Sequence, residues 1–210
     1  MHVDVSPPVD APNPTDAGDA GRDASDSGFD APIDAPDATC TPTTCPPVKF
    51  ECLPEAPATG GGLSLSSIFY VAWRFQVPAG RTLVTSQVGA LIRPTTTTGT
   101  LFATIMPLVG PTATLKPALT TSDVLGSGII SLNGVGTEPR VFSVPLVVTL
   151  APGWYAVAFG TNMLGASGAD ASIVTLSDSG CNNGQFLLTV RYTGENISQA
   201  AGGHLYVLAQ

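Results

Sequence analysis

The chain has few charged residues, and very few basic ones, which excludes several classes of protein. Lysine and arginine together number 8 of 210 residues, aspartate and glutamate number 16, and the formal net charge is −8. Phosphate binding needs clustered basic side chains, so we expect no nucleic-acid partner. The sequence also lacks an apolar run of about eighteen or more residues and therefore predicts no transmembrane segment.

Residue types suited to catalysis are equally scarce. Two histidines occur, and the only one in the C-terminal part, His204, lies in a strand-like run where we interpret it as an ordinary strand residue. The string Gly165–Ala169 departs from the Gly-x-Ser-x-Gly nucleophile motif. A carboxylate pair for glycoside hydrolysis stays formally open, although Asp123, Glu138, Asp170 and Asp178 are interpreted as solvated loop charges. We predict no enzyme, no catalytic residue, no metal and no cofactor, with a structural calcium at Asp170 and Asp178 as a side alternative.

The acidity is confined to the N-terminal part. Residues 1–62 contain nine aspartates and two glutamates against two basic residues, whereas residues 63–210 contain five acidic and six basic ones. Residues 1–39 form a drifting Asp-Ala-Pro repeat whose few apolar side chains cannot offset about 1–2 kcal/mol of backbone entropy per residue. We predict a disordered acidic spacer at 1–39, a cysteine-bearing hinge at 40–62 and a folded domain at 63–210.

Four cysteines, an even number, suggest two disulfides in an exported protein. They are Cys40, Cys45, Cys52 and Cys181. Their spacing does not match a zinc knuckle, the rival interpretation. Of three possible connectivities we favour Cys40–Cys45 with Cys52–Cys181, because the second bond would tie the hinge to the domain. By the chain-entropy model, that long loop would contribute about 4–5 kcal/mol of stability.

Residues 63–210 show the period-two alternation of β-strands. The clearest case is the segment 69–77, where one face carries Phe69, Val71, Trp73, Phe75 and Val77 and the other Tyr70, Arg74 and Gln76. Similar runs at 84–92, 100–108, 140–150, 154–160, 185–192 and 204–209 are separated by Gly, Pro and Asn turns. Seven to nine short strands without an amphipathic helix predict an all-β, antiparallel two-sheet sandwich that is jelly-roll-like. Pro107 and Pro145 lie inside such runs, so their strands should be edges or carry bulges.

One exposed aromatic residue and one polar loop form the candidate ligand site. Sugar recognition combines an aromatic platform with amide and carboxylate groups. Trp154 faces away from the apolar side of its strand, and the loop at 178–185 supplies polar groups. The candidates are Trp154, Asp178, Asn182, Asn183 and Gln185. Trp73 and Tyr192 lie on apolar faces and are interpreted as core, and Asn-Asn-Gly is also an ordinary turn signal.

Two stretches resemble a known kind of module. They are GTLFATIMPLVGPTATLKPALTTSDVLGSGIISL and VFSVPLVVTLAPGWYAVAFGTNMLGASGA, with shared motifs at Asp123–Gly126, Leu150–Ala156 and Phe159–Gly168. They resemble the uncharacterised β-sandwich modules of exported bacterial proteins, including those with a PEP-CTERM sorting tail. The Asp-Ala-Pro segment before the cysteines resembles the spacer of a surface lipoprotein. This resemblance implies a sandwich and a surface location, and it implies no activity and no functional residue.

These observations predict a non-catalytic extracellular or cell-surface module displayed on an acidic stalk, in adhesion, matrix contact or envelope structure. We expect an export signal, in the lipoprotein case one that ends in a lipidated cysteine, to lie upstream of this chain or to have been removed from it. The partner would be an extracellular glycan or a cell-surface or matrix component. The alternatives are a carbohydrate-binding module and a self-associating fibre subunit in which the segment 48–51 adds a strand to a neighbour.

Overall fold

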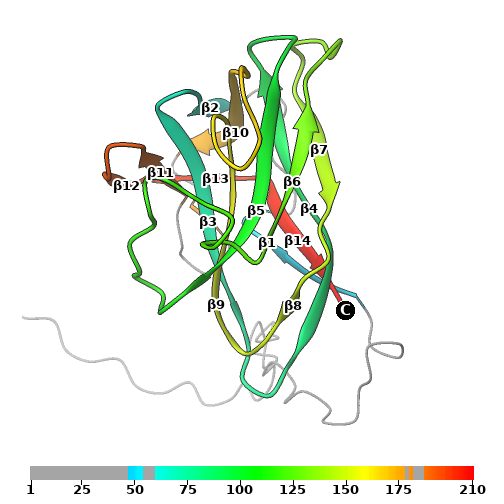
Figure 1. The fold of residues 1–210 in the computed structure, drawn as a ribbon, viewed down its shortest axis with the longest axis vertical. Coiled ribbons are helices and arrows are strands. Elements are labelled where there is room, and N and C mark those ends of the chain that lie inside the picture. Colours follow the sequence, from blue (N-terminus) through cyan, green and yellow to red (C-terminus); the bar gives the residue numbers. More distant parts are fainter. Residues whose placement is uncertain (1–46, 54–59, 178–179, 182–186) are drawn as a thin grey trace, which may run out of the picture. The chain divides into compact units, whose positions relative to one another are not determined.

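The computed structural model describes residues 47–53, 60–177, 180–181 and 187–210. Within these ranges the regular structure consists of β-strands alone (Figure 1). No helix in this part of the chain has the length and apolar character needed to cross a bilayer. The predicted spacer at 1–39 lies outside the described residues, and so do Cys40 and Cys45.

Six antiparallel strands form one sheet. Their order is β12 (Asn196–Ser198), β11 (Leu188–Arg191), β3 (Phe69–Val77), β9 (Gly153–Gly160), β5 (Thr100–Leu108) and β6 (Gly126–Ser131). The long central strand β9 pairs with β3 on one side and with β5 on the other, so β3, β9 and β5 form the middle of this sheet.

Eight strands form the second sheet, again with antiparallel pairing. Its main path is β1 (Val48–Glu51), β14 (Leu205–Ala209), β4 (Leu83–Pro94), β10 (Ala171–Ser177) and β13 (Ala201–Gly203). In addition, β2 (Gly61–Leu65) pairs with β10, while β7 (Arg140–Pro145) and β8 (Thr149–Leu150) pair with β4.

Eight of these strands have the arrangement of a jelly roll. Strands β1, β14, β4 and β7 are successive neighbours in one sheet, and β3, β9, β5 and β6 are successive neighbours in the other. The chain passes repeatedly from one sheet to the other, as expected for two interlocked Greek keys. The predicted all-β two-sheet antiparallel sandwich is therefore confirmed, and its topology is that of a jelly roll.

The inner core lies between the two sheets and follows from the alternation along each strand. On β3 the inward residues are Val71, Trp73, Phe75 and Val77, each at most 2% exposed. Phe75 contacts three other rings, at centroid distances of 5.1 Å from Phe50, 5.7 Å from Trp73 and 5.8 Å from Tyr155. Because Phe50 belongs to β1, this aromatic cluster joins the two sheets. Full burial of each such side chain contributes about 1.5–3 kcal/mol.

The described residues contain fourteen strands, more than the seven to nine that the sequence predicts. The additional strands are short or rich in glycine and serine, such as β6 with the sequence GSGIIS. The proline expectation is confirmed for β7, an edge strand, whereas β5 is an interior strand that lacks a partner on one side only where Pro107 lies. Pro145 ends β7, which pairs only with β4 in the described part of the chain. Pro107 lies beyond the last β5–β6 pair, Ile105 with Gly126, where β5 has a partner only on the β9 side.

The predicted disulfide between Cys52 and Cys181 is present. It joins cysteines that are 129 residues apart in sequence, and both side chains are buried. Cys52 directly follows β1, and its N–H donates to the Leu205 carbonyl at 3.0 Å. Since β1 pairs with β14 over four residues, the sandwich includes residues 48–51, upstream of the boundary predicted at residue 63. The segment that the fibre alternative would lend to a neighbour is paired here within its own chain.

Candidate functional site

The six-stranded sheet carries a second apolar layer on its outer face. Side chains alternate along a strand, so those between the inner-core positions point outward. On the three central strands these are mostly apolar and buried: Tyr70, Ala72, Phe102, Met106, Ala156 and Ala158. We call this group, with the residues packed on it, the outer cluster. An antiparallel sheet commonly leaves one face to water, so other parts of this chain must cover this one.

Two long connections cover the outer face. The β5–β6 loop, residues 109–125, places Leu115 and Leu119 on it, and the β9–β10 loop, residues 161–170, adds Met163 and Leu164. Leu164 has a φ of 51°, in the left-handed region that costs a residue with a Cβ about 1 kcal/mol or more. Its packing against the outer cluster offsets this strain. The β5–β6 loop, residues 109–125, is unusually long for a segment without regular structure in a compact domain. Loops of that length are frequently functional.

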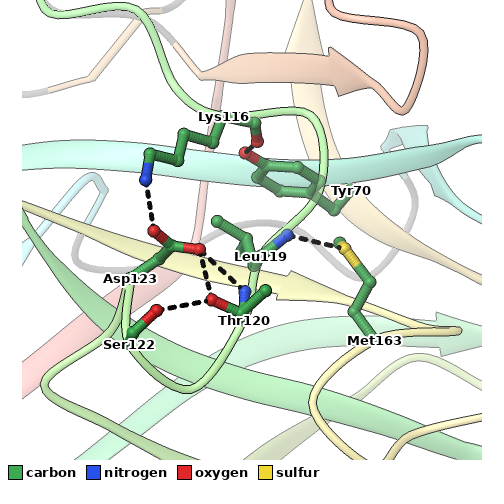
Figure 2. Close-up of polar contacts among 7 residues, drawn as sticks. All are labelled: Tyr70, Lys116, Leu119, Thr120, Ser122, Asp123 and Met163. Carbon is green, nitrogen blue, oxygen red and sulfur yellow. Dashed lines mark hydrogen bonds and ion pairs between the residues drawn. The ribbon is translucent and has the colours of Figure 1, made fainter.

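Two side chains of β3 fix the β5–β6 loop to the sheet. The Tyr70 hydroxyl donates to the carbonyl of Lys116 (Figure 2). Arg74 Nη2 donates to the carbonyl of Ala113 at 2.7 Å. Burial raises the pKa of the Tyr70 phenol well above its usual range, so this hydroxyl retains the proton that it donates. Both bonds bridge tens of residues and pair part-buried loop carbonyls with donors on the sheet.

Two further contacts hold the same loop from other sides. The Asn196 side chain donates to the Leu115 carbonyl at 3.0 Å and accepts the Leu115 N–H at 2.9 Å. The Leu119 N–H points at the Met163 sulfur at 3.1 Å (Figure 2). The loop is therefore held by β3, by the edge strand β12 and by the β9–β10 loop, and its conformation is set before any ligand arrives.

A polar cluster closes the end of this loop. The Asp123 carboxylate forms an ion pair with Lys116 and accepts hydrogen bonds from Thr120, from N–H at 2.9 Å and from the hydroxyl at 2.7 Å (Figure 2). The Asp123 side chain is 13% exposed and that of Lys116 is 68% exposed. Asp123 is therefore a loop charge, as interpreted, but one that is paired and hydrogen-bonded rather than freely solvated. Hydrogen bonds from Lys116 and then from Thr120 lower its pKa to about 2.

We expect the Asp123 cluster to keep its charge down to strongly acid pH. A carboxyl whose pKa is lowered on folding stabilises the fold above its ordinary value of 3.8, and this contribution is lost as pH falls toward about 2. The measurement is an NMR titration of the Asp123 carboxyl and of the Thr120 amide. In Asp123→Asn the Thr120 amide should lose its pH dependence between pH 4 and 2. A carboxyl that titrates near its ordinary value would contradict this arrangement.

A cavity of 310 Å³ opens between the β5–β6 loop and the end of β5. The buried part of its lining is apolar and includes Met106, Leu115 and Leu119, joined by the half-buried Leu108. The exposed part carries the polar Thr114, Lys116 and Ser122, with the Asp123 carboxylate beside them, and the apolar Pro107 and Val109. Its volume is at the lower end of the range of about 300–1,000 Å³ for small-molecule pockets.

Trp154 does not line this cavity, but it is paired across the sheet with Leu108, which does. On β9 it is directly opposite Leu108 of β5 and Gln76 of β3, and it faces outward like Ala156. Residues opposite each other on one face have Cβ atoms about 4.5–5.5 Å apart, so the Trp154 side chain starts next to that of Leu108. Trp154 is half-buried and belongs to neither hydrophobic cluster of the described residues, whereas Trp73 is 2% exposed in the inner core.

Of the five candidate ligand residues, the structure describes Trp154 alone; Asp178, Asn182, Asn183 and Gln185 lie outside the described residues. Sequence reasoning did not identify Lys116, Thr120 or Asn196 as parts of a site. The Thr-x-x-Asp spacing at 120–123 is the one local pattern that could have indicated the polar cluster. Tyr192 packs against the outer cluster and donates to the Thr161 carbonyl; burial raises its pKa to about 12.

His204 has structural contacts. His204 lies between β13 and β14, with Nδ1 at 3.1 Å from the Leu53 carbonyl and its ring at 5.3 Å from that of Tyr206. Within the described ranges, no three His, Cys, Asp or Glu side chains converge as metal ligands.

Comparisons with known proteins give no family for this chain. No protein-family model matches it, and no curated protein matches it. Among solved structures, a chain in the structure of the infectious bursal disease virus Gx strain is similar, with 14% identity and a TM-score of 0.28. The match covers 79% of this chain and 40% of the viral chain, so this chain spans less than half the length of the viral one. A likeness at this level carries no argument about function.

Proposed function

We propose that this protein is a non-catalytic extracellular or cell-surface module, a jelly roll displayed on an acidic N-terminal stalk, that acts in adhesion, matrix contact or envelope structure. The observation that carries the proposal is the buried Cys52–Cys181 disulfide. Disulfides that tie distant segments persist in oxidising compartments and are rare in the cytosol. The acidic, proline-rich segment ahead of the domain fits a spacer between a domain and a surface.

The location can be tested on protein isolated from the cells that produce it. Free thiols are alkylated during lysis, and peptides are then mapped by mass spectrometry without reduction. We expect a linked Cys52–Cys181 peptide, together with digestion of the protein by protease added to intact cells. Alkylation of both cysteines, with protection from that protease, would place the protein inside the cell and overturn the proposal.

Carbohydrate binding is a second candidate, favoured by the position of Trp154. An indole that contributes to neither cluster, next to a cavity with polar groups at its mouth, fits the stacking platform of a sugar site. An adhesive surface module would use such a site to hold a glycan. The polar groups near the platform are Gln76 on the neighbouring strand and the Lys116–Asp123 pair.

We expect Trp154→Ala to weaken binding to any glycan that the unaltered protein retains on an array by at least about tenfold, by analogy with the stacking of nucleic-acid bases on aromatic side chains, which contributes about 1–3 kcal/mol. Trp154→Phe keeps part of the aromatic platform, so its glycan affinity should lie between that of Trp154→Ala and that of the unaltered protein. Neither change should lower the thermal unfolding midpoint much. Equal glycan binding by Trp154→Ala and the unaltered protein would contradict a platform role.

A further inference from the structure

We infer that the cavity under the β5–β6 loop is a subsite for a single neutral sugar ring that carries an apolar substituent, such as a 6-deoxyhexose or an N-acetylhexosamine. The inference rests on the carbohydrate-binding candidate above, and it adds the place and the chemical class of the ligand. We therefore expect the ligand to contact the end of β5 and the β5–β6 loop instead of the loop at 178–185.

The size and lining of the cavity limit what it can accept. At 310 Å³ it has room for one ring rather than for an extended chain. Its buried wall of Met106, Leu115 and Leu119 offers no hydrogen-bonding side chain and suits a methyl group or the C–H face of a ring. A fully polar ligand would lose its water there without compensation, so the part of the ligand that enters must be apolar.

The electrostatics of the mouth favour a ligand without charge. Lys116 and Asp123 neutralise each other, and among the residues that the structure describes no other charged one lines the cavity. An anionic or cationic ligand would have to compete with this closed pair. Hydroxyl groups need no such competition, because a carboxylate accepts from them, and the exposed ammonium and the Ser122 hydroxyl can donate to them.

Trp154 supplies the remaining face of the site. Trp154 is not among the residues that line the cavity, but it is the cross-strand partner of Leu108, which is, so a ligand that extends from the cavity past Leu108 toward β9 would meet it. A pyranose combines an apolar C–H face for stacking with hydroxyls around its edge, which matches an indole on one side and polar groups on the other. A purely aliphatic ligand would leave the polar mouth unused.

The site is preformed, which lowers the entropy lost on binding. Tyr70, Arg74 and Asn196 hold the loop carbonyls and amides that frame the cavity, and Asp123 closes the end of the loop. None of these bonds requires a ligand. The same residues that stabilise the fold therefore keep the cavity open and hold its wall in a fixed position relative to Trp154.

The test uses the full chain and five probes: L-rhamnose, L-fucose, N-acetyl-D-glucosamine, D-glucose and D-galactose. Binding is followed by saturation-transfer NMR and by tryptophan fluorescence. The chain has two tryptophans and Trp73 is buried in the inner core, so a ligand-dependent change reports on Trp154. We expect the first three probes to bind more tightly than glucose and galactose, with their methyl or acetyl protons receiving the strongest saturation.

Two matched variants separate the cavity from the rest of the face. Thr114→Phe places a ring in the cavity from an exposed lining position, and Thr112→Phe makes the same change two residues away at an exposed position that does not line it. We expect at least tenfold weaker sugar binding for Thr114→Phe and unchanged binding for Thr112→Phe, with both variants folded by circular dichroism.

The outcomes of these experiments distinguish the cavity subsite from the more general proposal of carbohydrate binding. If Trp154→Ala abolishes glycan binding while Thr114→Phe leaves it intact, carbohydrate binding stands and the cavity subsite is wrong. If neither the five probes nor the glycans of an array bind the unaltered protein, the carbohydrate candidate fails and the subsite with it. Preferential binding of an aliphatic alcohol such as cyclohexanol over every sugar would likewise overturn the inference.

Discussion

Reduction of the Cys52–Cys181 disulfide is expected to lower the free energy of unfolding by about 4–5 kcal/mol, by the chain-entropy model for a loop of this length. The bond spans 129 residues, so most of the domain lies inside the closed loop. A domain has only about 5–15 kcal/mol of net stability. The loss would therefore remove a large share of it, and the denaturant midpoint should fall sharply.

The bond also determines which part of the domain is lost first. Cys52 directly follows β1, and β1 pairs over four residues with β14 and with no other strand in the described part of the chain. Without the disulfide, β1 is held by this short ladder and by the packing of Phe50 on Phe75. We expect the amides of residues 48–51 to exchange with solvent well before those of β3 or β9.

The experiment needs a background in which only one disulfide can change. Cys40→Ser with Cys45→Ser gives that background, because reduction then affects the Cys52–Cys181 bond alone. Chemical denaturation is measured with and without reductant, at constant pH, alongside hydrogen exchange of β1. Equal stability of the oxidised and reduced forms would mean that the bond contributes nothing to the fold.

For the proposed display this result has a direct meaning. Residues 1–47 precede β1, so a pull on the stalk reaches the domain through β1 and then Cys52. With the disulfide intact, extension stops at Cys52, since residues 53–180 lie inside the covalent loop. Reduction would leave the β1–β14 ladder, the hydrogen bonds from Cys52 and Leu53 and the packing of Phe50, all of them non-covalent, between the stalk and the rest of the sandwich.

The inner core could be predicted from the sequence because its pattern is local. The alternation in 69–77 assigns Val71, Trp73 and Phe75 to one face without knowledge of the partner strands. A cysteine count and the position of Cys181 were likewise enough to favour the bond with Cys52, and Pro145 indicated an edge strand. Each of these conclusions depends on a single segment or a single residue type.

The covered outer face could not be predicted in the same way. It depends on the β5–β6 loop, where Leu115 and Leu119 are four residues apart, a helical spacing, but Pro117 lies between them and the segment forms neither a helix nor a strand. The hydrogen bond between Asn196 and Leu115 joins residues 81 positions apart, and no local sequence pattern near either residue predicts it. Sequence reasoning therefore found Trp154 but could not place it next to a cavity made by a distant loop.

Replacement of Tyr70 is expected to have the second large effect, since this residue joins the sheet to the loop. Tyr70 is fully buried in the outer cluster, with its ring 6.3 Å from that of Phe102 and 6.0 Å from that of Tyr192. Truncation of a buried aromatic residue to alanine costs about 3–5 kcal/mol. We expect Tyr70→Ala to lose that much and to release the loop from the sheet.

The variant Tyr70→Phe separates the two roles of this side chain. It keeps the ring and removes only the hydroxyl that donates to Lys116, so the global loss should be about 0.5–1.5 kcal/mol. The amides of Leu115 and Leu119 should nevertheless exchange faster, because the loop that carries them has lost one of its fixed points. Hydrogen exchange with NMR detection measures this, together with denaturant unfolding for the global term.

Tyr206→Phe is the matched control for this comparison. Tyr206 lies in β14 of the other sheet, is 8% exposed, and its hydroxyl has no hydrogen bond to the described residues. Loss of that hydroxyl should leave both stability and loop exchange unchanged. If Tyr70→Phe behaves like Tyr206→Phe, the Tyr70 hydroxyl does not hold the loop, and the preformed cavity loses one of its supports. If Tyr70→Phe speeds exchange of the loop amides without lowering the free energy of unfolding, the apolar packing of the outer cluster supplies the stability of this face. The hydrogen bonds of the loop then set the shape of the site.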